Sequence, residues 1–129
     1  MICVDSSVWI EHLRGDVEIT KHINARLDTR EVLLPAPVRI ELLAGASVRG
    51  QIYLRDNLST LPTVEPGEQT WSRMETWCER ATAAGQHFQC IDLLIAALAA
   101  EADAPVWSLD RAFERMARLG FIQLFRPPA

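Results

Sequence analysis

The chain alternates between short apolar runs and longer segments with helical periodicity, and this alternation restricts its fold more than any other feature. The apolar runs are Met1–Val4, Val32–Leu34, Thr63–Val64, Val106–Ser108 and Phe121–Phe125. Strands that alternate with helices pair in parallel, and their sheet is covered by helices on both faces. We therefore expect an α/β fold: a three-layer α/β/α sandwich with a central parallel sheet of four to five short strands. A length of 129 residues corresponds to one domain, residues 1–129.

The segments between these runs carry the end signals and spacings of helices. Asp16 is expected to cap one helix, and Pro37 to open another at its first position, where a missing N–H costs nothing. The segment Phe88–Ala102 contains a single charged residue, Asp92, before Glu101, which predicts a helix packed on several sides. A spacing of three and four predicts an amphipathic helix with Trp71, Met74, Cys78 and Ala81 on one face.

Composition excludes several classes of protein. The net charge is −4, from 13 basic and 17 acidic residues, which argues against binding nucleic acid through overall positive charge. Three cysteines without a C-x-x-C pair indicate reduced thiols in a cytoplasmic chain, and the three histidines fit no metal-ligand spacing. The longest purely apolar run, Leu93–Ala100, is too short to cross a membrane.

Four carboxylates interrupt the apolar pattern. Asp5 directly follows the first strand, Asp110 follows the strand that contains Val106, and Asp92 lies at the head of the most apolar helix. Capping of a helix is the alternative interpretation for each of these three. Glu41 lies one turn inside a mostly apolar helix, so capping does not explain it, and an unpaired ionised side chain there is costly.

The four carboxylates together suggest a metal site. If the first strand and the Val106 strand are neighbours, Asp5 and Asp110 meet at the carboxyl edge of the sheet, where open α/β sheets bind ligands. Carboxylates this close repel one another unless a hard divalent cation lies between them. Oxygen ligands without His or Cys favour Mg²⁺ or Mn²⁺. The matching chemistry is attack of a metal-activated water on a phosphodiester, with one or two cations.

Four motifs in order resemble the PIN-domain ribonuclease toxins of the VapC type. They are Met1–Ile10 with Leu13–Gly15, then Arg39–Gly45, Cys90–Ala97 and Trp107–Phe113. The resemblance covers essentially the whole chain. It implies an Mg²⁺- or Mn²⁺-dependent endoribonuclease, the toxin of a type II toxin–antitoxin pair, that cleaves structured RNA such as tRNA or ribosomal RNA. It also implies a homodimer whose site is covered by a cognate antitoxin.

The resemblance assigns roles to individual residues. The catalytic and metal-binding acids are Asp5, Glu41, Asp92 and Asp110, and two supporting hydroxyls, Ser6 and Ser108, match positions that hold a water or a phosphate oxygen. Some relatives carry a further acid where this chain has Ala112, which leaves the choice between one and two cations open. Four arginines near the motifs are candidate RNA contacts, with a solvated or ion-paired surface role as the alternative: Arg14, Arg39, Arg111 and Arg115.

Other functions fit less well. A haloacid-dehalogenase-type phosphatase needs a second Asp where this chain has Ser7, and a receiver domain needs a lysine near its last strand, whereas Lys21 is the only lysine. The remaining alternative is a catalytically inactive PIN-like module that binds RNA or protein. Such a module tolerates neutral replacements of its acids, and all four acids are present here.

Overall fold

Four short strands form one parallel sheet in the computed structural model, which describes residues 1–129. The strands are β1 (Ile2–Val4), β2 (Val32–Pro35), β3 (Thr63–Val64) and β4 (Val106–Trp107), in the order β3-β2-β1-β4. The register pairs Ile2 with Val32 and Cys3 with Val106. β1 therefore lies inside the sheet between β2 and β4, and the predicted parallel sheet of an α/β fold is confirmed.

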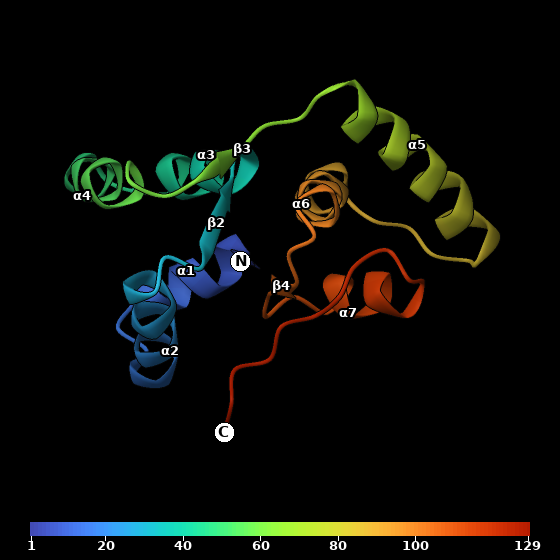
Figure 1. Ribbon diagram of the computed structural model, residues 1–129. Coiled ribbons are helices and arrows are strands. Elements are labelled where there is room, and N and C mark those ends of the chain that lie inside the picture. The colour runs from blue at the N-terminus through green and yellow to red at the C-terminus, as the bar shows by residue number, and fades with distance from the viewer.

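Seven helices flank the sheet. Figure 1 shows α1 to α4 on one side of the strands and α5 to α7 on the other. Because β1, β2 and β4 are parallel and each leads into a helix, namely α1, α3 and α7, their carboxyl ends lie at one edge. The helices are α1 (Ser6–Leu13), α2 (Val17–Asp28), α3 (Ala36–Ala44), α4 (Val48–Leu58), α5 (Glu68–Ala83), α6 (Cys90–Glu101) and α7 (Arg111–Arg118).

The core is organised around α6. Its residues 93 to 99 are all buried, and the helix contacts α3, α5, α7 and β2. Alanines at 96, 97 and 99 leave room for neighbouring backbones to approach closely. The expected helix with several packed sides is confirmed, and its apolar sequence is explained by contact with a neighbour on each side.

The segment Phe121–Phe125 does not form the fifth strand that the sequence predicts. It makes one isolated bridge, between Leu124 and Val106, with backbone hydrogen bonds from Val106 N to Gln123 O and from Phe125 N to Val106 O, each 2.8 Å. The reason is the length of β4. It has only two residues, and only Val106 pairs on the side of β4 that faces the C-terminal segment.

Two smaller expectations also need correction. The buried face of α5 consists of Thr70, Met74, Trp77 and Ala81, whereas Trp71 and Cys78 are exposed. Trp77 determines which face of α5 is buried, because its ring stacks on Phe121 at a centroid distance of 4.5 Å.

The start of α3 also differs from the prediction. The helix begins at Ala36, so Pro37 is its second residue. An N–H group at the second position of a helix has no hydrogen-bond partner within the helix either, so a proline there costs no hydrogen bond.

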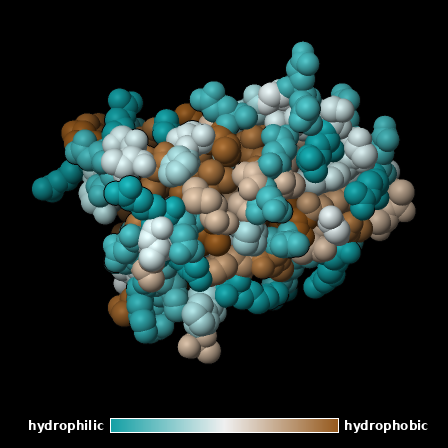
Figure 2. All heavy atoms as spheres, in the orientation of Figure 1, coloured by the Kyte–Doolittle hydropathy of each residue, from teal (hydrophilic) through white to brown (hydrophobic).

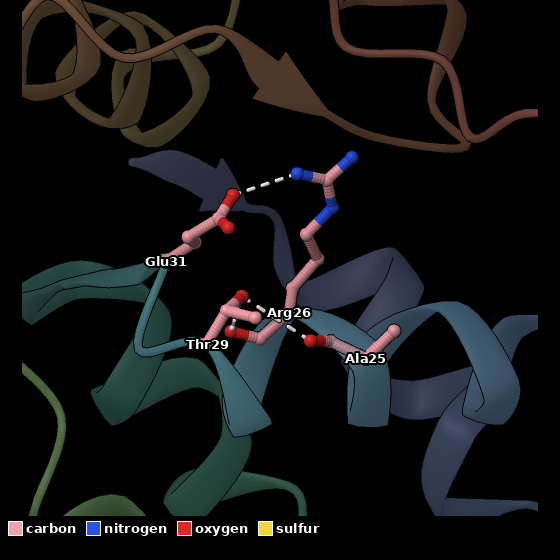
Figure 3. Close-up of polar contacts among 4 residues, drawn as sticks. All are labelled: Ala25, Arg26, Thr29 and Glu31. Carbon is pink, nitrogen blue, oxygen red and sulfur yellow. Dashed lines mark hydrogen bonds and ion pairs between the residues drawn. The ribbon is translucent and has the colours of Figure 1, made fainter.

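Contacts at the end of α2 connect the helix to the C-terminal segment. Arg26 forms an ion pair with Glu31 at 2.6 Å, and the Thr29 hydroxyl donates to the carbonyls of Ala25 and Arg26, closing the turn before β2 (Figure 3). The Arg26 guanidinium also lies 4.8 Å from the centroid of the Phe125 ring. These contacts hold the chain end against α2 without a strand.

Apolar side chains are not confined to the core. Figure 2 shows hydrophilic side chains around the rim of one face and apolar side chains gathered in a band across its middle. Large apolar residues exposed on helices include Val17, Ile40, Val48 and Ile52. None of the helices combines the length and the hydropathy needed to span a membrane.

We expect Ile95→Ala to lower the free energy of unfolding by about 2–5 kcal/mol, because this fully buried side chain of α6 leaves a cavity when truncated. Ile91→Ala on the same helix is the matched control. Its side chain is 43% exposed, and we expect a loss of about 1 kcal/mol or less. Urea unfolding measures both variants, and equal losses would contradict the central position of α6.

Candidate active site

The four carboxylates predicted from the sequence line one cleft at the carboxyl edge of the sheet. The cleft has a volume of about 490 Å³ and is formed by the residues that follow β1 and β4, by α1, α3, α6 and α7, and by the loop before α6. Its lining residues are Asp5, Ser6, Ser7, Ile10, Glu41, His87, Phe88, Gln89, Asp92, Asp110, Ala112 and Arg115.

Asp5 lies at the centre of a hydroxyl network. It occupies the N-cap position of α1, but its side chain caps no backbone N–H. Instead its Oδ2 accepts hydrogen bonds from the hydroxyls of Ser7 and Ser108, both at 2.8 Å, and its Oδ1 accepts a longer one from Ser6 at 3.5 Å. The capping interpretation is therefore wrong for Asp5, whose buried carboxylate is oriented by three side chains.

Ser7 and Ser108 are themselves held by the backbone. The N–H of Leu109 donates to Ser7 Oγ and the N–H of Asp110 donates to Ser108 Oγ, each at 3.0 Å. Each hydroxyl is therefore an acceptor for one N–H and a donor to Asp5. Sequence reasoning missed Ser7 as a site residue. The available signal was a hydroxyl two residues after the acid that ends the first strand.

Glu41 reaches the same network from α3. Ser6 Oγ donates to Glu41 Oε1 at 3.1 Å and also lies 3.5 Å from Asp5 Oδ1, so one hydroxyl bridges the two acids. Partial burial raises the pKa of Glu41, the hydrogen bond from Ser6 opposes this, and the negative charge of Asp5 raises it further. Ser6 and Ser108 thus donate hydrogen bonds to these acids. Their expected role of holding a water or a phosphate oxygen stays a prediction.

Asp92 projects from the first turn of α6. It is half-buried and caps no backbone N–H. Burial raises its pKa from 3.8 to about 6, and the negative charges of Asp110, Asp5 and Glu41 contribute in that order, with Arg115 acting in the opposite direction. All three other acids thus act on Asp92, which is the electrostatic sign of a shared site.

The two carboxylate oxygens of Asp110 have different surroundings. Its Oδ1 accepts the N–H of Ala112 at 2.9 Å and so caps α7. Its Oδ2 has no partner within the chain. The capping interpretation is correct for one oxygen of this acid, and the other oxygen remains available to the cleft.

Comparison with known proteins identifies the family. The PIN domain model matches residues 2–119. The chain belongs to the PIN-domain family. It is 31% identical to Ribonuclease VapC18 of Mycobacterium tuberculosis over 92% of this chain and 89% of that protein, which confirms the resemblance to VapC-type PIN domains.

Solved structures show the same fold at low sequence identity. VapBC2 from Rickettsia felis bound to a promoter DNA fragment matches with a TM-score of 0.81 at 16% identity, covering 97% of this chain and 98% of that one. VapBC-1 from nontypeable Haemophilus influenzae matches with a TM-score of 0.78 at 17% identity and 97% coverage of both chains. The predicted PIN-like architecture is therefore confirmed.

The donor set of this PIN domain fits a hard divalent cation. The cleft offers carboxylate and hydroxyl oxygens, which suit Mg²⁺ or Mn²⁺. No three His, Cys, Asp or Glu side chains are gathered closely enough to hold a metal ion as they stand. Mg²⁺ commonly keeps several waters and takes only one or two carboxylates directly, so the residues present fit a partly hydrated ion.

The structure separates the four candidate arginines of this PIN domain. Arg115 lines the acidic cleft, whereas Arg14 is exposed and paired with Glu11 at 3.1 Å. Arg39 donates to Thr63 Oγ1 at 3.0 Å and lines a groove between α3 and α4 that contains none of the four acids. Arg111 is exposed outside the lining of the cleft. Of the four, only Arg115 lines the cleft, whereas Arg14 lines a second groove that contains Glu41.

A second, larger groove adjoins the acidic cleft. It has a volume of about 640 Å³, lies among α1, α3 and α4, and shares Ile10 and Glu41 with the cleft. Half of its twelve lining residues are hydrophobic. A molecule bound in this groove would therefore touch an acid of the candidate site.

We expect Asp92 to contribute a fall in the stability of the chain without divalent cations as the pH rises from about 4 to about 6. The pKa of Asp92 is near 3.8 in the unfolded chain and about 6 in the fold, so the folded state binds more protons over this interval. Asp92→Asn should remove much of this fall and raise the free energy of unfolding at neutral pH by about 1 kcal/mol, a value reduced for solvent screening of a half-exposed side chain.

Urea unfolding at several pH values, with a chelator present, measures this dependence. Glu79→Gln is the control, because Glu79 is exposed on α5 and is not among the residues that line the cleft. An Asp92→Asn variant whose stability has the same pH dependence as that of the parent would contradict the raised pKa of Asp92 in the folded state.

Proposed function

We propose that this PIN domain is an endoribonuclease that uses Mg²⁺ or Mn²⁺ to hydrolyse phosphodiester bonds in structured RNA such as tRNA or ribosomal RNA. The observation that carries the proposal is the convergence of Asp5, Glu41, Asp92 and Asp110, from four separate parts of the chain, on one cleft. Kinship with a protein named a ribonuclease, VapC18, supports the same reaction.

The residues of the cleft have separate roles in binding and in orientation. When bound, the cation would act as a Lewis acid and activate water for in-line attack on the phosphodiester. Asp5 presents Oδ1 toward Ser6, since Ser7 and Ser108 both bind its Oδ2, and Asp110 presents its free Oδ2. Ala112 lines the cleft where some relatives carry a further acid, which favours one cation over two.

Asp92→Asn should abolish metal-dependent cleavage, with a loss of at least about 100-fold in rate, because it removes one charged ligand and leaves an isosteric neutral side chain. Incubation of the purified protein with total RNA and Mn²⁺, followed by sequencing of the new 5′ ends, measures activity and target together. Glu79→Gln should retain full activity.

Full activity in Asp92→Asn would remove this residue from the mechanism. A parent protein that cleaves no RNA with either cation, yet still binds it, would favour the inactive PIN-like module instead.

We further propose that a cognate antitoxin covers the cleft and that the toxin acts as a cytoplasmic homodimer. The proposal rests on kinship with VapC-type proteins and on the groove that shares Ile10 and Glu41 with the cleft. An antitoxin segment in this groove would contact Glu41 and exclude RNA from the acids.

Expression of the chain alone should arrest growth, because unrestrained RNA cleavage stops translation, and co-expression of the antitoxin encoded beside it should restore growth. Growth curves after induction measure both effects, with Asp92→Asn as the inactive control. Equal arrest by the parent and by Asp92→Asn would show that toxicity does not come from the cleft.

A further inference from the structure

Arg115 is held in a fixed position at the rim of the acidic cleft. It projects from α7, and its Nη1 donates to Gln86 Oε1 at 2.7 Å and to the His87 carbonyl at 3.4 Å. Its guanidinium carbon lies 4.7 Å from the centroid of the Phe88 ring. Three consecutive residues of the loop before α6 thus fix one side chain by two hydrogen bonds and a cation–π contact.

The loop is in turn anchored to the core. Phe88 packs edge-on against Phe121 at a centroid distance of 6.3 Å, and Phe121 stacks on Trp77. The N–H of Gln86 donates to the carbonyl of Ala81 at 2.8 Å. Phe88, which is half-buried, therefore links Arg115 to the buried rings of Phe121 and Trp77.

The contacts of Arg115 leave part of its guanidinium unused. Both hydrogen bonds come from Nη1, and neither Nη2 nor Nε has a partner within the chain. Arg115 is also the only arginine or lysine among the residues that line the cleft. An arginine with free donors in a fixed plane is suited to grip a phosphate through its fork.

We propose that Arg115, positioned by Gln86 and Phe88, binds a phosphate group of the RNA backbone beside the bond that is cut. This inference rests on the proposed nuclease function and adds a substrate-binding residue to it. Four carboxylates line the cleft and repel a phosphodiester wherever a cation does not compensate them. Arg115 supplies fixed positive charge at this rim, and Gln86 and Phe88 are positioning residues that act through it.

Binding of fluorescently labelled bulk tRNA to the Asp92→Asn protein, measured by anisotropy in Mg²⁺ at several salt concentrations, tests the proposal. Adding Arg115→Gln should weaken binding about tenfold and lower the slope of log affinity against log salt by about 1. Arg118→Gln is the matched control, because it removes the same charge from the same helix outside the cleft. It should change neither quantity comparably.

Two further variants separate a phosphate contact from a structural role. Arg115→Lys keeps the charge but loses the fork, and Gln86→Leu keeps Arg115 but removes its hydrogen-bond partner. Both should weaken binding by less than Arg115→Gln and keep the salt slope near that of the parent. In the parent protein, which retains Asp92, Gln86→Leu should raise KM for RNA cleavage more than it lowers kcat.

If Arg115→Gln and Arg118→Gln have the same affinity and salt slope, the phosphate role of Arg115 is overturned even when the parent cleaves RNA. If the parent cleaves no RNA, the nuclease proposal fails separately. A lower salt slope confined to Arg115→Gln would then still support the phosphate site. Circular dichroism of each variant establishes that its fold is retained before binding is compared.

Discussion

The parallel pairing of β1 with β4 is the constraint on which the candidate site depends. The N–H of Asp5 donates to the Trp107 carbonyl at 2.9 Å, so the residues that follow each strand leave the sheet side by side. This pairing brings Ser108 to Asp5 across 103 positions of sequence. Because β4 ends after two residues, the chain turns at once into the loop that carries Ser108 and Asp110. A one-residue shift in register would point Asp5 away from this loop.

The cluster of acids works against the stability of the fold that holds it. Asp92 and Glu41 both have raised pKa values, with burial as the first cause and neighbouring negative charge as another. The seven residues that follow Asp92 in α6, 93 to 99, are all buried. Burial of that apolar surface stabilises the helix in place, so the same element supplies an unfavourable charge and the packing that offsets it. This coupling suits a site whose electrostatic repulsion is relieved by a bound cation.

The cleft carries charges of both signs. Four acids line it together with Arg115, which the aromatic loop before α6 holds in place. The phosphate backbone of the proposed RNA substrate would be attracted both by a cation held among the acids and by the arginine beside them. The adjoining groove shares Glu41 with the cleft, so one acid lies where substrate binding and partner binding would meet.

Local sequence determined the helices, four of the five expected strands, the order of these elements, and the acids that stand out from apolar surroundings, because periodicity and burial preferences act over a few residues. The isolation of Asp92 within its apolar helix is one such signal. The tertiary structure alone decided which side chains join those acids. Arg39 and Arg115 both lie near motifs in the sequence, yet Arg39 projects from α3 about 200° around the helix from Glu41 and binds Thr63. Ser7 meets Leu109 through the register of β1 with β4, and Phe88 is placed by Phe121, which stacks on Trp77. These contacts join residues far apart in the sequence, so no local pattern encodes them.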